Sequence, residues 1–292
     1  MDRIIFGDNQ FFGINHMSED KARQQSMRFA DLDPIMDTLR AARHAGINAF
    51  MCTTHDRIAE VAEVVRRSPG EWPGYAFYPC MPYAHKYANA VTEYGYFDAL
   101  KRFLPGGGLI DAAMRGGKAL LTRDMESVAT LLIDAEMKPF KGLNTPIVFV
   151  QNVVTDLILG LGYFEAFRIF ADHIAKRYDA EAGFITMNLP MLLPALDSAG
   201  IVNPIVCANV NKIGFRMSGG IDAYRQATDR WPARVIAMSV LASGAIPPAE
   251  AIEWVVGERY VRSILFGASS ERNIRNTVEL IHRFDAAALA PA

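Results

Sequence analysis

The sequence predicts an α/β fold, a single (β/α)8 TIM barrel, from three observations. The chain has 292 residues, a usual length for one barrel of this kind. It contains eight short, β-rich apolar runs, and most are continuously apolar, as expected for strands buried on both faces of a parallel sheet. Helical patterns fill the intervals between the runs. The expected strands are residues 3–7, 49–53, 75–80, 147–151, 184–188, 205–209, 235–239 and 263–266.

Local signals place the connecting helices. Asp33 is the expected N-cap of the first helix, Pro34 suits its first position, and Gly46 suits its end. A later helix opens at Pro247-Pro248, and the last begins near Ser269 or Ser270. A doubly wound open sheet is the alternative, because a strand count does not prove that the sheet closes.

One connection is too long for a single helix. Residues 81–146 separate the third and fourth expected strands and contain a glycine run followed by helical patterns. We interpret this segment as an extended βα connection that forms a lid over the barrel mouth, with an oligomer contact as the alternative. No repeat or linker divides the chain, so residues 1–292 are expected to form one domain.

Composition excludes several classes of protein. The net charge is −2 without a long basic block, which argues against a nucleic-acid binder. No apolar run reaches the length of about 18 residues that a membrane-spanning helix needs, and no signal peptide is visible. The three cysteines lack C-x-x-C spacing, which suits free thiols in the cytoplasm.

Polar side chains collect where the expected strands end, and in a barrel the carboxyl ends of the strands carry the chemistry. Residues 7–16 bring a carboxylate, three amides, two aromatic rings and an imidazole directly after the first strand. The alternative is a polar loop whose Asn and Asp side chains only close turns.

Three histidines, His16, His55 and His85, follow three consecutive strands. Adjacent strands lie roughly 5 Å apart, so these imidazoles could converge with Asp8 or Asp56. Two histidines and one carboxylate suit Fe(II), and also zinc or manganese. We expect His16, His55 and Asp8 as metal ligands, with His55, His85 and Asp56 as catalytic groups; metal-free acid–base use of one histidine is the alternative.

Amides and aromatic rings form a second group at the strand ends. An amide both donates and accepts hydrogen bonds without charge, which suits a small, polar, ring-containing substrate. The expected substrate-binding residues are Asn9, Gln10, Phe12, Tyr78, Gln151, Asn188, Asn209 and Asn211. Several of these amides could instead only close turns.

The last strand runs into a turn suited to anions. Gly267 permits close backbone approach, Ser269 and Ser270 precede a helix N-terminus, and Arg272 could add a bidentate contact. A phosphate is expected here, with an ordinary capped helix as the alternative. Lys212, after the sixth strand, is a weaker candidate for a Schiff base or an anion contact.

Two stretches resemble the aldo-keto reductases. Residues 41–56 are similar to that family's first helix and second strand. Residues 235–281 are similar to its last two βα units, through Leu241 and Gly244, Ile252-Glu253-Trp254 and Phe266-Gly267-Ala268-Ser269. The resemblance implies the barrel fold, and it implies that Arg272 and Asn276 stand where the family contacts the adenosine phosphate of NADPH.

The family's catalytic Asp, Tyr, Lys and His do not carry over. Met51 or Cys52 stands at the aspartate position, His55 or Asp56 near the tyrosine position, Tyr78-Pro79-Cys80 where the lysine is needed and Gln151-Asn152 where the histidine is needed. Without the tyrosine, carbonyl reduction lacks its usual proton donor, so the scaffold is expected to be shared and the chemistry to differ.

The leading expectation is therefore a metal-dependent barrel enzyme, a non-haem Fe(II)-type oxidoreductase or oxygenase. Its cofactor would be a divalent metal, and its partner a small-molecule substrate, with no nucleic acid or membrane and with a homo-oligomer left open. The alternatives are an NAD(P)H-dependent aldo-keto reductase-like oxidoreductase, with NADPH as cofactor, and a metal-free lyase or isomerase with His55 as base. A non-enzymatic binding barrel is a further alternative.

Overall fold

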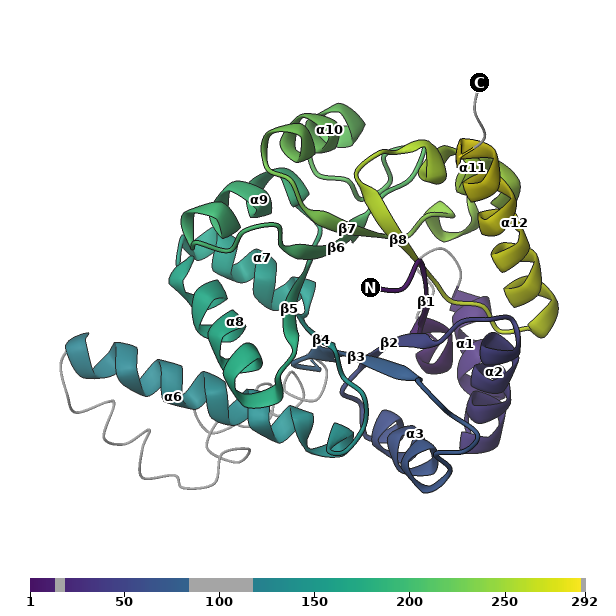
Figure 1. Cartoon of the computed structure of the whole chain (residues 1–292), viewed down its shortest axis with the longest axis horizontal. Helices are drawn as coiled ribbons and strands as arrows, with labels where there is room; N and C mark the ends of the chain where they lie inside the picture. The colour runs from purple at the N-terminus through teal and green to yellow at the C-terminus, as the bar shows by residue number, and fades with distance from the viewer. Residues whose placement is uncertain (14–18, 84–117, 290–292) are drawn as a thin grey trace.

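Eight parallel strands close into a barrel in chain order (Figure 1). The computed structural model describes residues 1–13, 19–83 and 118–289. This closure confirms the predicted (β/α)8 barrel and excludes the open sheet. The strands are β1 (Ile4–Gly7), β2 (Ala49–Thr53), β3 (Ala76–Met81), β4 (Ile147–Val150), β5 (Glu181–Thr186), β6 (Ile205–Asn209), β7 (Arg234–Met238) and β8 (Val261–Phe266).

Helices surround the barrel, and the segments that the sequence assigned to helices contain them. Among the described residues they are α1 (Glu19–Arg28), α2 (Leu32–His44), α3 (Asp56–Arg67), α6 (Lys118–Met137), α7 (Asn152–Leu161), α8 (Glu165–Tyr178), α9 (Leu189–Ser198), α10 (Gly220–Arg230), α11 (Pro248–Gly257) and α12 (Glu271–Leu289). Short 3-10 turns are η1 (Asn9–Phe12), η2 (Lys138–Phe140) and η3 (Ala242–Gly244). Gly46 follows α2 with a φ of 90°, as its place after a helix predicted.

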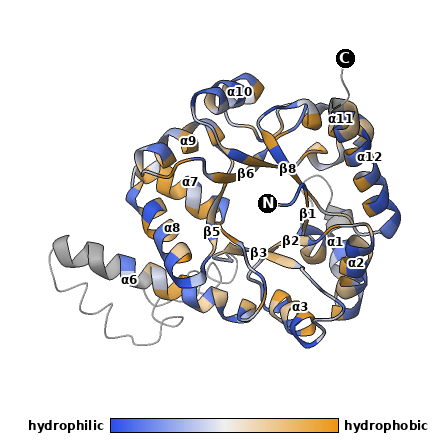
Figure 2. Cartoon of the chain, in the orientation of Figure 1, coloured by the Kyte–Doolittle hydropathy of each residue, from blue (hydrophilic) through white to orange (hydrophobic). Residues whose placement is uncertain are grey.

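Two apolar cores explain why the strands are continuously hydrophobic. One fills the layer between strands and helices, and the other fills the barrel itself. Helices such as α2 and α3 turn their apolar residues toward the barrel (Figure 2), whereas α7 exposes Val153, Leu157 and Leu161. The interior is packed by Ile5, Ala49, Met51, Ala76, Tyr78, Cys80, Ile147, Phe149, Ile185, Ile205, Cys207 and Ile236. The barrel is therefore a solid support for the polar groups at its rim.

Strand β5 differs most from its prediction, since it begins at Glu181 rather than at residue 184. A Cβ at Gly183 would lie 2.2 Å from the ring of Phe149, so only glycine lets that ring cross the strand. Arg234, the first residue of β7, donates a hydrogen bond of 3.1 Å to the Glu181 carboxylate. Glu181 and Gly183 do not have the apolar character of a buried strand, so the sequence did not reveal where β5 begins. Their partners, Arg234 and Phe149, belong to other strands.

The long connection between β3 and β4 is described only in part. Helix α6 is attached to α8, because Asp134 accepts a hydrogen bond from the Tyr178 hydroxyl at 2.5 Å and lies 2.8 Å from His173 Nε2. Residues 84–117 lie outside the described residues, so the predicted lid keeps the status of a prediction. Among the helices described, none is long and apolar enough to cross a membrane.

Candidate functional site

A buried carboxylate lies at the carboxyl ends of β1 and β2. Asp8 follows β1 directly, and its side chain is 6% exposed. Its Oδ2 accepts two hydrogen bonds from Thr53 at the end of β2, one from the backbone N–H at 2.7 Å and one from the hydroxyl at 2.8 Å. The pairing of Gly7 with Met51 aligns the two strand ends in this way. Burial raises the pKa of Asp8 from 3.8 to about 6, while the bonds from Thr53 oppose that rise.

Three aromatic rings, those of Phe12, His55 and Tyr83, pack together near the ends of β1, β2 and β3. His55, the N-cap of α3, lies with its ring centroid 4.4 Å from that of Phe12 and 5.1 Å from that of Tyr83. Its Nδ1 accepts a hydrogen bond from the Arg57 backbone N–H at 3.0 Å. In the neutral imidazole the proton must then sit on Nε2. Burial and the charge of Asp8 both raise the pKa of Tyr83.

Strand β8 adjoins the Asp8 end of β1. Phe6 pairs with Phe266, which aligns the turn after β8 with the turn after β1. Gln10 is buried in that turn and donates from Nε2 to the Gly7 carbonyl at 2.7 Å. A Cβ at Gly267 would lie 2.0 Å from Gln10 Oε1, so Gly267 is required for this approach. Gln10 thus joins two strand ends.

The turn after β8 leads into the N-terminus of α12. Ser270 Oγ accepts from the Asn273 backbone N–H at 3.3 Å, which makes it a capping residue. A hollow of about 540 Å³ lies along the first turns of the helix, lined by Glu271, Arg272, Arg275, Asn276 and Glu279. Arg275 pairs with Glu271 at 2.7 Å, whereas Arg272 has no ion-pair partner among the residues described.

Three of the amides expected to bind substrate support turns. Asn188 caps α9, with Oδ1 accepting from the Met191 N–H at 3.3 Å. Asn211 both accepts from the Phe215 N–H and donates to its carbonyl, which closes the loop after β6. Asn209 donates to the Arg216 carbonyl at 3.0 Å, and its buried Oδ1 has no partner among the described residues.

The other expected site residues lie in different surroundings. Tyr78 lies inside the barrel, and its hydroxyl donates to Asp2 at 2.6 Å, at the amino end of the strands. Asn9 and Asp56 are exposed, and Gln151 precedes α7 without a side-chain capping bond. Lys212 pairs with Glu250 at 2.8 Å on the surface. His16 and His85 lie outside the described residues.

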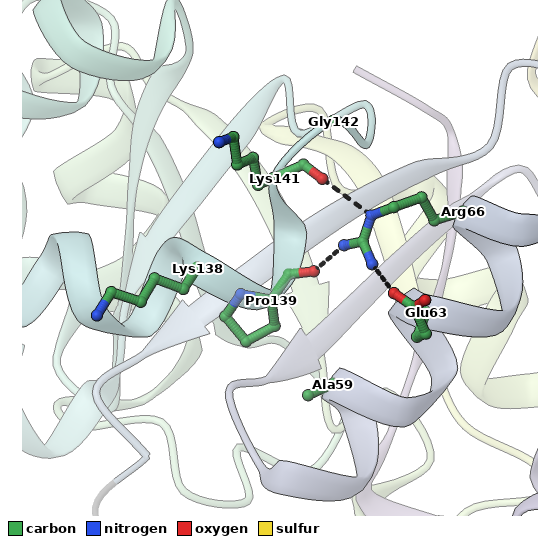
Figure 3. A pocket seen from close by; sticks show the side chains of 7 residues that line it. All are labelled: Ala59, Glu63, Arg66, Lys138, Pro139, Lys141 and Gly142. Atoms are coloured by element: carbon green, nitrogen blue, oxygen red, sulfur yellow. Dashed lines mark hydrogen bonds and ion pairs between the residues drawn. The ribbon is translucent and has the colours of Figure 1, made fainter.

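A second hollow lies at the opposite end of the barrel. It has a volume of about 690 Å³ and lies between α3 and the segment before β4 (Figure 3). The Arg66 guanidinium spans it, donating to the carbonyls of Lys141 at 3.0 Å and Pro139 and to Glu63. These bonds stabilise the fold at the amino end of the strands, away from the carboxylate and the aromatic rings.

Sequence reasoning missed the part played by Thr53. It was recognised as the end of a strand, but nothing in the sequence pairs it with Asp8, which is 45 positions away. Asp156 of α7 was missed in the same way: it accepts from the Thr186 hydroxyl at 2.5 Å and from the Met187 N–H at 3.1 Å. Such partners are visible only once the strands and helices are packed together.

The comparisons with known proteins support the fold. No family model and no curated protein matches the sequence. Solved structures do match, among them a protein assigned as an aldo-keto reductase from Pseudomonas aeruginosa, with a TM-score of 0.59 and 13% identity over 97% of this chain and 91% of that one.

Two further solved structures are similar along nearly the whole chain. The glycerol dehydrogenase of Gluconobacter oxydans matches at a TM-score of 0.55 and 11% identity over 98% of this chain and 90% of that one. An Asp→Ala variant of Gox0644, solved in complex with NADPH, matches with a TM-score of 0.53 and 12% sequence identity. The match covers 96% of this chain and 83% of that one. The distant resemblance to aldo-keto reductases is confirmed at the level of the fold.

The prediction of a metal-dependent, Fe(II)-type enzyme is wrong. Among the side chains that the structure describes, no three His, Cys, Asp or Glu groups come close enough to hold a metal ion. Two of the atoms that could have bound it are occupied, since Thr53 donates to Asp8 Oδ2 and Arg57 donates to His55 Nδ1. Among the similar solved structures, one is assigned as an aldo-keto reductase and another was solved in complex with NADPH.

Proposed function

We propose that this chain is an NAD(P)H-dependent oxidoreductase that reduces a carbonyl group of a small, polar, ring-containing molecule. The observation that carries the proposal is the turn after β8. There Arg272, which has no ion-pair partner among the described residues, and a capped helix N-terminus border a hollow on an aldo-keto reductase-like barrel. The buried cysteines suit a reducing compartment, so we place the enzyme in the cytoplasm.

The described residues fit a dinucleotide phosphate at this turn. Backbone N–H groups at a helix N-terminus favour an anion, and a guanidinium binds phosphate in a bidentate manner. Arg272 supplies that guanidinium, and Ser269 supplies a half-buried hydroxyl. Glu271 also lines the hollow, but its charge is paired with Arg275. A bound nicotinamide would supply the hydride.

Residues on three neighbouring strand ends would hold the substrate. Phe12 and Tyr83 offer ring surfaces on two sides of His55, which suits a planar or ring-containing molecule. Asp8 provides a carboxyl group at the same strand ends. Asn188 and Asn211 are occupied in turns, so we do not assign them to the substrate; Gln151 stays a proposed contact.

The alternative of a lyase or isomerase with His55 as base is less compatible with the geometry. A base needs a free lone pair on the ring, yet Nδ1 accepts from Arg57 and Nε2 carries the proton in the neutral form. His55 is better suited to donate a hydrogen bond from Nε2 than to abstract a proton.

Cofactor binding tests the proposal directly. Calorimetric titration of the full chain with NADPH should show saturable binding of one molecule per chain, and the bound cofactor should be oxidised by members of a panel of aldehydes and quinones. Titration with ADP-ribose is the matched control for binding through the nucleotide half alone. Absence of NADPH binding at millimolar cofactor, or of any oxidation across the panel, would refute the function.

A further inference from the structure

Asp8 is one of the buried carboxylates among the described residues, together with Glu136 and Glu258. It is buried at the mouth end of β1, and both hydrogen bonds from Thr53 go to one oxygen, Oδ2. No other described residue donates a hydrogen bond to the second oxygen, Oδ1, since both bonds from Thr53 go to Oδ2. Burial disfavours the ionised form of this carboxyl group, and the bonds from Thr53 leave Oδ1 available to a substrate.

Asp8 forms no ion pair with any other described residue. The ion pairs of the described residues involve other carboxylates, and the titratable groups that feel the charge of Asp8 are Cys52 of β2, Cys80 of β3 and Tyr83. Each is neutral when protonated, and Cys52 and Cys80 are fully enclosed in apolar surroundings. The turn after β8 brings Gln10 and Gly267, which carry no charge. A buried acid in such a site holds its proton to unusually high pH.

Asp8 is also close to the aromatic rings where the substrate is proposed to lie. Thr53, which binds Asp8, is two residues before His55, and the ring of His55 lies against Phe12 and Tyr83. Phe12 belongs to the turn η1 that begins directly after Asp8. The carboxyl group and the rings are thus fixed by the same two strand ends.

We propose that Asp8 is the proton donor of the reduction, acting from Oδ1 in place of the missing tyrosine. This inference rests on the proposed function. A bound reduced nicotinamide would supply the hydride for the new C–H bond at the carbonyl carbon, and the C=O electron pair would move to oxygen. That oxygen takes the proton of the Asp8 carboxyl group, which leaves an alcohol, oxidised nicotinamide and the Asp8 carboxylate. Water then returns a proton to Asp8.

The proposal gives Thr53 a specific part as a positioning residue. Its hydroxyl bond favours the ionised carboxylate and keeps the acid from holding its proton too tightly. Replacing the hydroxyl by a methyl group of similar volume leaves the backbone N–H bond in place. Thr53→Val should therefore raise the pKa of Asp8 and extend activity to higher pH, whereas a purely structural bond would leave the pH profile unmoved.

The experiment compares wild type, Asp8→Asn, Thr53→Val and the control Asp172→Asn, a surface carboxylate of α8. Asp8→Asn should bind NADPH as wild type does but lose about 10²- to 10⁴-fold in kcat for the panel aldehydes. Wild-type kcat should fall above about pH 6. In Thr53→Val this fall of kcat should begin at a higher pH. Carbon-13 NMR of Asp-labelled protein measures the titration of Asp8 without any substrate, and the Asp8 signal is assigned by its absence in Asp8→Asn. The titration midpoint of Asp8 should be higher in Thr53→Val than in wild type.

The outcomes separate this inference from the function it rests on. Wild type that neither binds NADPH nor reduces the panel refutes the function. Wild-type activity together with unchanged kcat in Asp8→Asn refutes the role of Asp8 alone. An Asp8 signal that titrates below about pH 4.5 also refutes it, because such a group is ionised at neutral pH.

Discussion

Asp8 and Thr53 join the carboxyl ends of β1 and β2 through two hydrogen bonds to a single carboxylate oxygen, of 2.7 and 2.8 Å. The pair fixes a buried acid beside His55 and Phe12. Because Asp8 is buried, its protonation should affect the pH dependence of the free energy of unfolding as well as that of the activity.

Replacing Asp8 by Asn should stabilise the protein at neutral pH. The pKa of Asp8 is raised to about 6 in the folded chain, so its contribution to stability is present below the unfolded value of 3.8 and is lost as the pH rises through 6. Asp8→Asn should raise the free energy of unfolding by about 1 to 3 kcal/mol near pH 7.5 and by nothing near pH 4. Urea unfolding at both pH values measures this. If Asp8→Asn changed the free energy of unfolding equally at both pH values, the cost of burying an ionised Asp8 would be contradicted.

Replacing Arg272 by Ala should weaken NADPH binding. A charge-assisted contact to phosphate contributes about 1.5 to 3 kcal/mol, which corresponds to a roughly 10- to 100-fold rise in Kd. NADH, which lacks the 2′-phosphate, should be affected less. Arg283→Ala, on a later turn of α12, is the matched control for net charge. If both variants bind NADPH equally well, the phosphate does not lie at Arg272.

Two substitutions of His55 should separate its structural part from its chemical part. Asn can cap α3 as His55 does by accepting from the Arg57 N–H, whereas Ala cannot. His55→Ala should therefore be about 1 kcal/mol less stable to urea than His55→Asn. Both should lose the ring contacts with Phe12 and Tyr83 and show a higher KM for ring-containing carbonyl substrates. An unchanged KM in His55→Asn would exclude the ring from the site.

Substituting Gly183 by Ala should test the packing inside the barrel. The new methyl group would overlap the ring of Phe149, so a loss of about 1 to 3 kcal/mol is expected. Gly160→Ala is the control, because nothing lies within 4 Å of that Cβ and alanine favours the helix α7. The second substitution Phe149→Leu should recover part of the loss. Equal stability of Gly183→Ala and wild type would contradict the packing.

The sequence by itself determined the barrel, its eight strands and the rim where the polar residues gather. Continuous apolar runs such as 205–209 are buried on both faces wherever they lie, so their pattern can be recognised without knowledge of their neighbours. The turn at Ser270 and Arg272 was also recognised, because capping and helix starts depend on a few adjacent residues.

Only the tertiary structure decided what each polar group at the rim does. Asn188 and Asn211 follow strands, as ligand-binding amides often do, yet their side chains form hydrogen bonds within turns. Tyr78 donates a hydrogen bond to Asp2 at the other end of the barrel. Asp8 has Thr53 as its partner because β1 and β2 align in one register. A hydrogen-bonding side chain takes its role from the partner brought within about 3 Å, and in a parallel barrel that partner comes from a distant part of the chain.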